Sequence, residues 1–101
     1  MIIYNVTISI LDSSIEKLWL EWMQQIHIPD VMKTKKFSDY KIWKVLVDGE
    51  CTYAIQCSCK DQETLNEYLE HFAPKLMEEH TKKFNGKFGA FRTFLELIEQ
   101  G

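Results

Sequence analysis

The chain has 101 residues, of which 46% are hydrophobic, 13% aromatic and 27% charged, and its formal net charge is −3. This length excludes a multidomain enzyme, and the balance of apolar and charged residues is that of a folded chain. We therefore expect one domain, residues 1–101. The densest basic run, Lys33 to Lys36, reads as a solvated loop, so we expect no nucleic-acid partner.

No stretch approaches the roughly 20 apolar residues of a membrane span, and the apolar N-terminus MIIYNVTISIL has no basic region. We expect no membrane partner and no signal peptide. The three cysteines, Cys51, Cys57 and Cys59, are odd in number and lie in one segment. Reduced thiols are the simplest account, which indicates a cytoplasmic protein, and the paired spacing of a zinc site is missing.

The first half of the chain predicts a strand followed by a helix. Residues 2–10 alternate with a period of two and are rich in β-branched side chains. Ser13 and Glu16 have capping-box spacing, and apolar residues then recur at intervals of three and four. They are Ile15, Leu18, Trp19, Trp22, Met23 and Ile26. This helix should end near Pro29, and a short second helix should run from Pro29 to about Lys35.

The second half predicts a hairpin and a long helix. Residues 40–47 and 51–60 read as strands, and Asp48-Gly49 between them is a strong turn signal. Asp61 should cap the helix, and Pro74 inside its pattern predicts a kink. Its inner face should carry Leu65, Leu69, Phe72, Leu76, His80 and Phe84.

A last strand over residues 88–98 completes the order β-α-β-β-α-β. With right-handed crossovers this order predicts an α+β, ferredoxin-like fold, in which a four-stranded antiparallel sheet of order 4-1-3-2 carries two helices on one face. The residues expected to meet the helices are Tyr4, Val6, Ile8, Tyr53, Ile55 and Cys57. Those expected on the opposite face are Asn5, Thr7, Ser9, Ala54, Gln56, Ser58, Ala90, Arg92, Phe94 and Glu96. The second strand adds either Trp43, Val45 and Val47 or Ile42, Lys44 and Leu46.

The sheet face opposite the helices is polar, short of charge and partly aromatic. A monomer rarely exposes so much partly apolar surface. Pairing of two such faces would cover it, so we expect the chain to be its own partner in a homodimer.

Several short motifs are distributed along the chain: MIIYNVT, LEWM with HIP and VM, TYA, HFAP with EH, and FRT. Together they resemble a family of short uncharacterised bacterial proteins described only as a domain of unknown function. The resemblance implies a dimeric α+β barrel, a group that includes small monooxygenases and haem-degrading enzymes. It implies no established activity.

The best polar cluster predicted for the open sheet face contains Asn5, Gln56 and Arg92. An arginine there can clamp a carboxylate or phosphate bidentately, and Phe94 would line the same ligand site. In the structural alternative, Arg92 pairs with Glu96 or with an acid of a second subunit. A one-residue error in register would move Arg92 to the other face.

His27 lies at the predicted end of a helix, where it can cap the last carbonyls or act as a general base. His71 and His80 are nine residues apart and should point to opposite sides of their helix, so we expect no shared metal. The resemblance to haem-degrading enzymes extends to Asn5 on the first strand. The second helix lacks the tryptophan that those enzymes use, so we expect no cofactor.

The leading hypothesis is a ligand-binding or structural module that uses the sheet face opposite the helices. The alternative is a cofactor-independent, monooxygenase-like or isomerase-like enzyme acting on a small aromatic or acidic metabolite in the barrel pocket. In that case His27 and Arg92 would be the catalytic residues.

Overall fold

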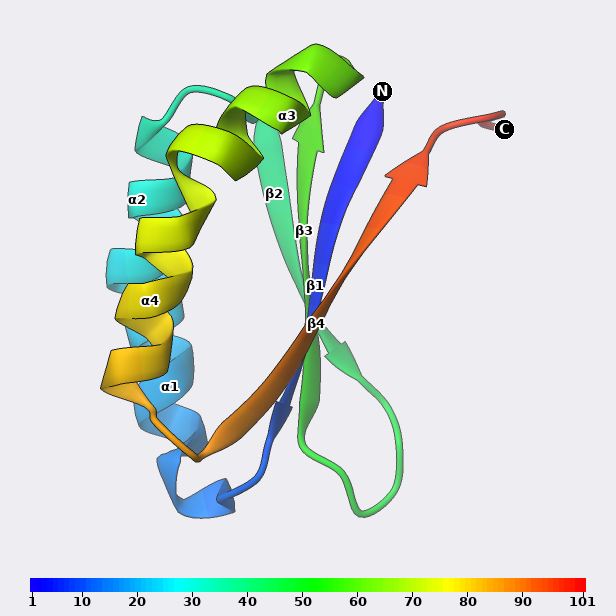
Figure 1. Cartoon of the computed structure of the whole chain (residues 1–101). Coiled ribbons are helices and arrows are strands. Elements are labelled where there is room, and N and C mark those ends of the chain that lie inside the picture. The colour runs from blue at the N-terminus through cyan, green and yellow to red at the C-terminus, as the bar shows by residue number, and fades with distance from the viewer.

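Four antiparallel strands form one sheet, and the helices cover one of its faces (Figure 1). The computed structural model describes all residues from Met1 to Gly101. The strands are β1 (Ile2–Ile10), β2 (Asp39–Val45), β3 (Thr52–Cys59) and β4 (Phe88–Glu96). Their spatial order is β2-β3-β1-β4, so the predicted ferredoxin-like fold is confirmed.

The chain stays helical past Pro29, so the predicted end of the helix there is wrong, whereas the predicted short second helix is present as α2 (Ile28–Lys33) with Pro29 in its first turn. A 3-10 turn (Ser13–Ile15) leads into α1 (Glu16–Trp22), a π-helical turn (Met23–His27) and α2 (Ile28–Lys33). In the π-helical turn the backbone N–H of Ile28 donates to the carbonyl of Met23, five residues earlier. This wider turn comes directly before Pro29, whose ring would otherwise clash with a carbonyl of the preceding turn. The altered phase also leaves Ile26 half exposed.

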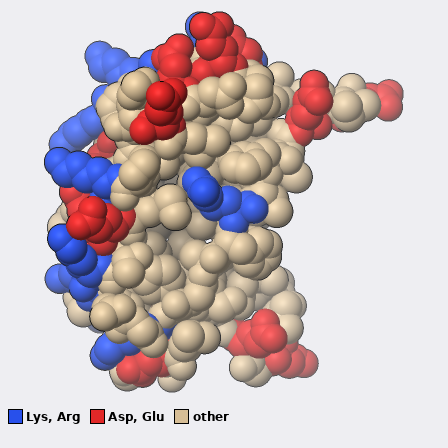
Figure 2. Space-filling model, in the orientation of Figure 1, with Lys and Arg blue, Asp and Glu red and all other residues tan.

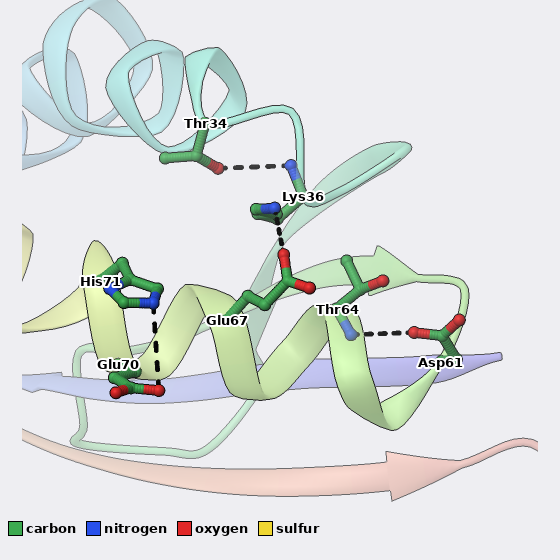
Figure 3. Close-up of polar contacts among 7 residues, drawn as sticks. All are labelled: Thr34, Lys36, Asp61, Thr64, Glu67, Glu70 and His71. Atoms are coloured by element: carbon green, nitrogen blue, oxygen red, sulfur yellow. Dashed lines mark hydrogen bonds and ion pairs between the residues drawn. The ribbon is translucent and has the colours of Figure 1, made fainter.

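The second helical segment has the predicted kink. It consists of α3 (Gln62–His71) and α4 (Ala73–Lys83), which meet at the non-helical Phe72. The Asp61 carboxylate caps α3 by accepting from the backbone N–H of Thr64 at 2.8 Å (Figure 3). An ion pair between Lys36 and Glu67 joins the loop after α2 to α3 (Figure 3).

The register of β1 and β3 confirms the predicted sides of these two strands. Tyr4, Ile8 and Ile55 are buried beneath the helices, whereas Asn5 lies opposite Gln56 on the other face. We call this other face the open face. For the second strand the sequence left two sets of residues possible on the open face. The structure places the set with Trp43 there, because Trp43 lies opposite Ala54.

The predicted side of β4 is wrong. Arg92 lies opposite Val6, on the face that meets the helices, and Thr93 lies opposite Asn5. Phe94 likewise faces the helices, where its ring stacks on Tyr4 with 5.9 Å between centroids. Ala90 and Glu96 share this side. Side chains alternate along a strand, so the one-residue difference in parity moves all four from the open face.

The hydrophobic core lies between the helices and the two central strands. Trp19, Met23 and Ile28 from the first helical segment and Leu65 from α3 are almost completely buried against Ile8. The edge strands differ: every residue of β4 after Phe88 is exposed, as is most of β2. The chain therefore covers the middle of one sheet face well and its edge at β4 poorly.

Candidate ligand-binding pocket

A pocket of about 430 Å³ lies between the sheet and the helices, toward β4. It is lined by β1, β3 and β4 below and by the π-helical turn, α2 and α4 above, and most of its wall is hydrophobic. Apolar wall residues include Val6, Ile8, Met23, Ile28, Ile55, Leu76 and Phe88. This volume falls in the range of small-molecule sites. This pocket lies on the opposite side of the sheet from the ligand site predicted for the open face.

Two histidines from separate helices meet in the pocket wall. His27 comes from the end of the π-helical turn and His80 from α4, and their ring centroids are 5.6 Å apart. The predicted divergence of His71 from His80 is confirmed, because His71 lies at the surface, 3.9 Å from Glu70 (Figure 3). The sequence singled out His27 but gave His80 no part in this site.

Aromatic rings hold the two histidines in place. Trp22 stacks on His27 and on His80, with centroid distances of 5.0 and 5.6 Å. Phe88 stacks on His80 at 3.9 Å. The indole Nε1–H of Trp19 donates to His80 Nε2 at 3.0 Å. The two tryptophans of the predicted apolar helix face therefore also support the pocket.

Both imidazoles are neutral at pH 7. Burial lowers the pKa of His27 to about 4, against a smaller opposing effect of Asp30. Burial and the neighbouring His27 lower the pKa of His80 to about 4 as well. The helix continues past His27, and the Nδ1 atom of His27 is buried without a hydrogen-bond partner. The predicted role of this ring in capping the last carbonyls of a helix is therefore not observed.

Arg92 supplies the positive charge of the pocket. It is the only arginine of the chain, and no carboxylate lies within ion-pair distance, so the alternative pairing with Glu96 is absent within the chain. Its guanidinium acts on the Tyr4 hydroxyl by hydrogen bonding and charge, but burial prevails and raises the pKa of Tyr4. Burial also raises the pKa of Tyr68. Arg92 therefore lies beside two protonated phenols.

The surface around this edge is almost uncharged. Figure 2 shows a broad area without charged side chains that surrounds an isolated basic group, whereas acids and lysines gather on the helices and at the two ends. Arg92 is the only basic residue within β4. An anion approaching this side thus meets one cation in apolar surroundings.

Asn5 and Gln56 do not join Arg92. Asn5 donates from its side chain to the hydroxyls of Thr93 at 3.0 Å and Thr7 at 3.3 Å. Gln56 accepts from the indole N–H of Trp43 at 2.9 Å. The predicted cluster of three polar residues is thus split between the two faces, because Arg92 has the opposite parity.

No three side chains among the histidines, cysteines and acids are placed to bind a metal ion together. All three cysteines are free. None of the helices has the length and apolar character needed to cross a membrane.

The fold and the pocket define a ferredoxin-like protein with a small-molecule-sized cavity between sheet and helices. Residues 1–98 match the sequence profile of the family DUF4286, a domain of unknown function. The chain belongs to this family, which confirms the resemblance found in its motifs. No curated protein sequence matches the chain significantly.

Solved structures with this fold have very different sequences. A dimeric ferredoxin-like protein from an uncultured marine organism aligns with a TM-score of 0.77 at 10% identity, over 99% of this chain and 96% of that one. HapK from Hahella chejuensis aligns with a TM-score of 0.73 at 10% identity, over 100% of this chain and 96% of HapK. SnoaB from Streptomyces nogalater, a cofactor-independent oxygenase, aligns with a TM-score of 0.69 at 7% identity, over 98% of this chain and 94% of SnoaB.

The two pocket histidines should make the stability of the protein depend on pH. Unfolding returns each imidazole to its ordinary pKa of 6.5, whereas the folded value is about 4. Between these values the unfolded chain binds protons that the folded chain does not, so the free energy of unfolding falls as the pH falls. We expect a loss of about 2 kcal/mol per histidine between pH 6.5 and 5, measured by urea unfolding. His80→Gln should flatten this dependence, whereas His71→Gln, a change at the surface, should not; equal slopes in both variants would contradict the assignment.

Proposed function

We propose that the protein binds a small, largely apolar molecule with an acidic group in the pocket between its sheet and helices. The observation that carries this proposal is the unpaired Arg92 at the wall of an apolar cavity. A guanidinium forms its strongest hydrogen bonds with carboxylates and similar anions. The chain itself offers none, and a ligand with an acidic group would supply one.

The rest of the pocket suits the apolar part of such a molecule. Beyond Arg92 the wall consists of aliphatic and aromatic side chains and of imidazoles that carry no charge at pH 7. A planar ring can pack against Phe88 and the aliphatic residues of β1. The ligand would therefore lie with its acid at Arg92 and its ring toward His27 and His80.

Binding of an aromatic anion tests this proposal. 8-Anilinonaphthalene-1-sulfonate combines an aromatic body with an anion, and N-phenyl-1-naphthylamine is the same molecule without the sulfonate. Arg92→Ala should weaken binding of the sulfonate by about 10- to 100-fold, the range for one charge-assisted hydrogen bond, and leave the neutral dye unaffected. Fluorescence titration measures both. Lys41→Ala on β2 removes an equal charge from the sheet and serves as the control; equal losses in the two variants would speak against a site at Arg92.

We further propose that the chain forms a homodimer through its open face. Trp43, Phe91 and Leu95 lie on this face with 51%, 61% and 46% of their surface exposed. Monomers rarely leave several large apolar side chains uncovered on one sheet face. The marine neighbours with this fold are described as dimeric, which supports the proposal.

Light scattering coupled to gel filtration tests the dimer. The native protein should elute with twice the chain mass of 12.0 kDa. Phe91→Glu places a charge in the proposed interface and should shift the species to the monomer mass. Leu18→Glu changes a similarly exposed leucine on α1, outside the open face, and should remain dimeric. A native protein of 12.0 kDa at micromolar concentration would disprove the dimer.

A second candidate function is proton abstraction from a carbon acid, the first step of a cofactor-independent oxygenation or of an isomerisation. His27 favours it, because its imidazole is neutral and lines the pocket. The cationic imidazolium would be costly there, but the anion formed on the ligand would pair with it. The fold shared with the oxygenase SnoaB is in keeping with this candidate.

Hydrogen–deuterium exchange on phenylpyruvate tests this second candidate. The molecule offers a carboxylate for Arg92 and an acidic C–H beside its keto group. The protein should accelerate exchange at that carbon in D₂O, followed by proton NMR. His27→Gln should reduce the acceleration at least about 100-fold, as expected for loss of a general base, and His71→Gln should not. Exchange that is no faster than in buffer would exclude His27 as a base toward this substrate class.

A further inference from the structure

The hydrogen bond between Trp19 and His80 fixes where the proton of His80 resides. The Trp19 side chain is completely buried, and its Nε1–H donates to His80 Nε2 at 3.0 Å. An indole nitrogen can donate but cannot accept. His80 Nε2 must therefore be the unprotonated nitrogen, and the single proton of the neutral ring is on Nδ1.

The surroundings of His80 favour one orientation of its ring over the flipped one. Trp22 and Phe88 stack on it, with centroids 5.6 and 3.9 Å away. A ring flip would turn carbon toward the Trp19 N–H and leave a buried donor unpaired, at a cost of about 1–3 kcal/mol. The stack thus fixes the plane of the ring, and the hydrogen bond from Trp19 selects the tautomer.

The protonated nitrogen is the one that remains free for a ligand. His80 lines the pocket, yet its Nδ1 makes no hydrogen bond within the chain. It also differs from His27 Nδ1, which is sealed from solvent without a partner. His80 Nδ1 is therefore not sealed, and the residue, 7% of which is exposed, lines the pocket.

We propose that Trp19 is a positioning residue that holds His80 as the Nδ1–H tautomer, so that His80 donates a hydrogen bond to an oxygen of the bound molecule. His80 is then not a base, which distinguishes it from His27. This inference rests on the proposed function and narrows it. The ligand carries an acceptor oxygen, such as a carbonyl or phenol oxygen, in addition to the acidic group at Arg92.

Nitrogen-15 NMR of the histidine side chains in the native protein tests the tautomer without any ligand. His80 should show a protonated Nδ1 and an unprotonated Nε2, with a scalar coupling across the hydrogen bond from Trp19 Nε1. A His80 ring protonated mainly on Nε2 would overturn the proposal. This measurement needs no variant, so it is decisive even where substitution of a buried tryptophan prevents folding.

Two tryptophan variants separate the hydrogen bond from mere packing. Trp19→Phe removes the donor and should give a mixture of His80 tautomers. Trp22→Phe alters a ring that stacks on the same imidazole without a hydrogen bond to it, and should leave the Nδ1–H form intact. An unchanged tautomer in Trp19→Phe would show that Trp19 does not position His80.

A pair of probe ligands tests the donor role. Phenylpyruvate has a keto oxygen beside its carboxylate, and 3-phenylpropionate is similar but lacks that oxygen. Phenylpyruvate alone should shift the His80 Nδ1 proton downfield, and it should bind at least about 5-fold more tightly, a difference that Trp19→Phe should reduce. An equal response to both probes would overturn the donor role. Failure of both to bind a protein with the expected tautomer would count against the proposed function and not against the role of Trp19.

Discussion

The edge strand β4 has no helix packed along it, and most properties of the candidate site follow from this. The helices bury β1 and β3, whereas β4 is exposed at nearly every position. An arginine buried beneath a helix without a partner would carry a desolvation cost of several kcal/mol. At the uncovered strand Arg92 keeps contact with water, so its charge can remain unpaired beside an apolar cavity. The incomplete cover thus permits both the pocket and its charge.

The opposite wall of the pocket depends on an irregularity in the backbone. The turn over residues 23–27 is π-helical and has more residues per turn than an α-helix. His27 therefore points in a different direction, relative to the residues before it, than it would in a regular α-helix. His27 consequently meets His80 and Trp22 from two different helices. The aromatic packing around both rings explains why they are neutral, because it removes the water that an imidazolium would need. One end of the pocket is therefore uncharged and the other cationic.

The fold could be predicted from the sequence because apolar residues recur there with a clear strand or helix period, which leaves few alternative arrangements. Strands β1 and β3 have one clearly apolar side, and their parity was correct. In β4 the two sides are nearly balanced, since Phe91, Thr93 and Leu95 alternate with Ala90, Arg92 and Phe94. A charged residue such as Arg92 belongs on the open face if helices cover the other face of its strand. No helix covers β4, so this assignment was wrong. The sequence placed His80 correctly on the inner face of its helix but missed its part in the pocket, because its neighbours Trp19 and Phe88 are far away in sequence.

The two faces of the sheet are not independent, because they meet at β4. Phe91 lies on the open face and also lines the pocket. The Asn5 amide donates to Thr93 on the same strand and so fixes β4 to β1 from the open side. A partner that packs on the open face would therefore press on the strand that carries Arg92, without covering the cavity on the helix side. In such a dimer each protomer keeps its own complete pocket, and the partner limits how far β4 moves away from α4. Packing of a second copy on the open face would in this way help to set the width of the pocket at β4, where no helix does.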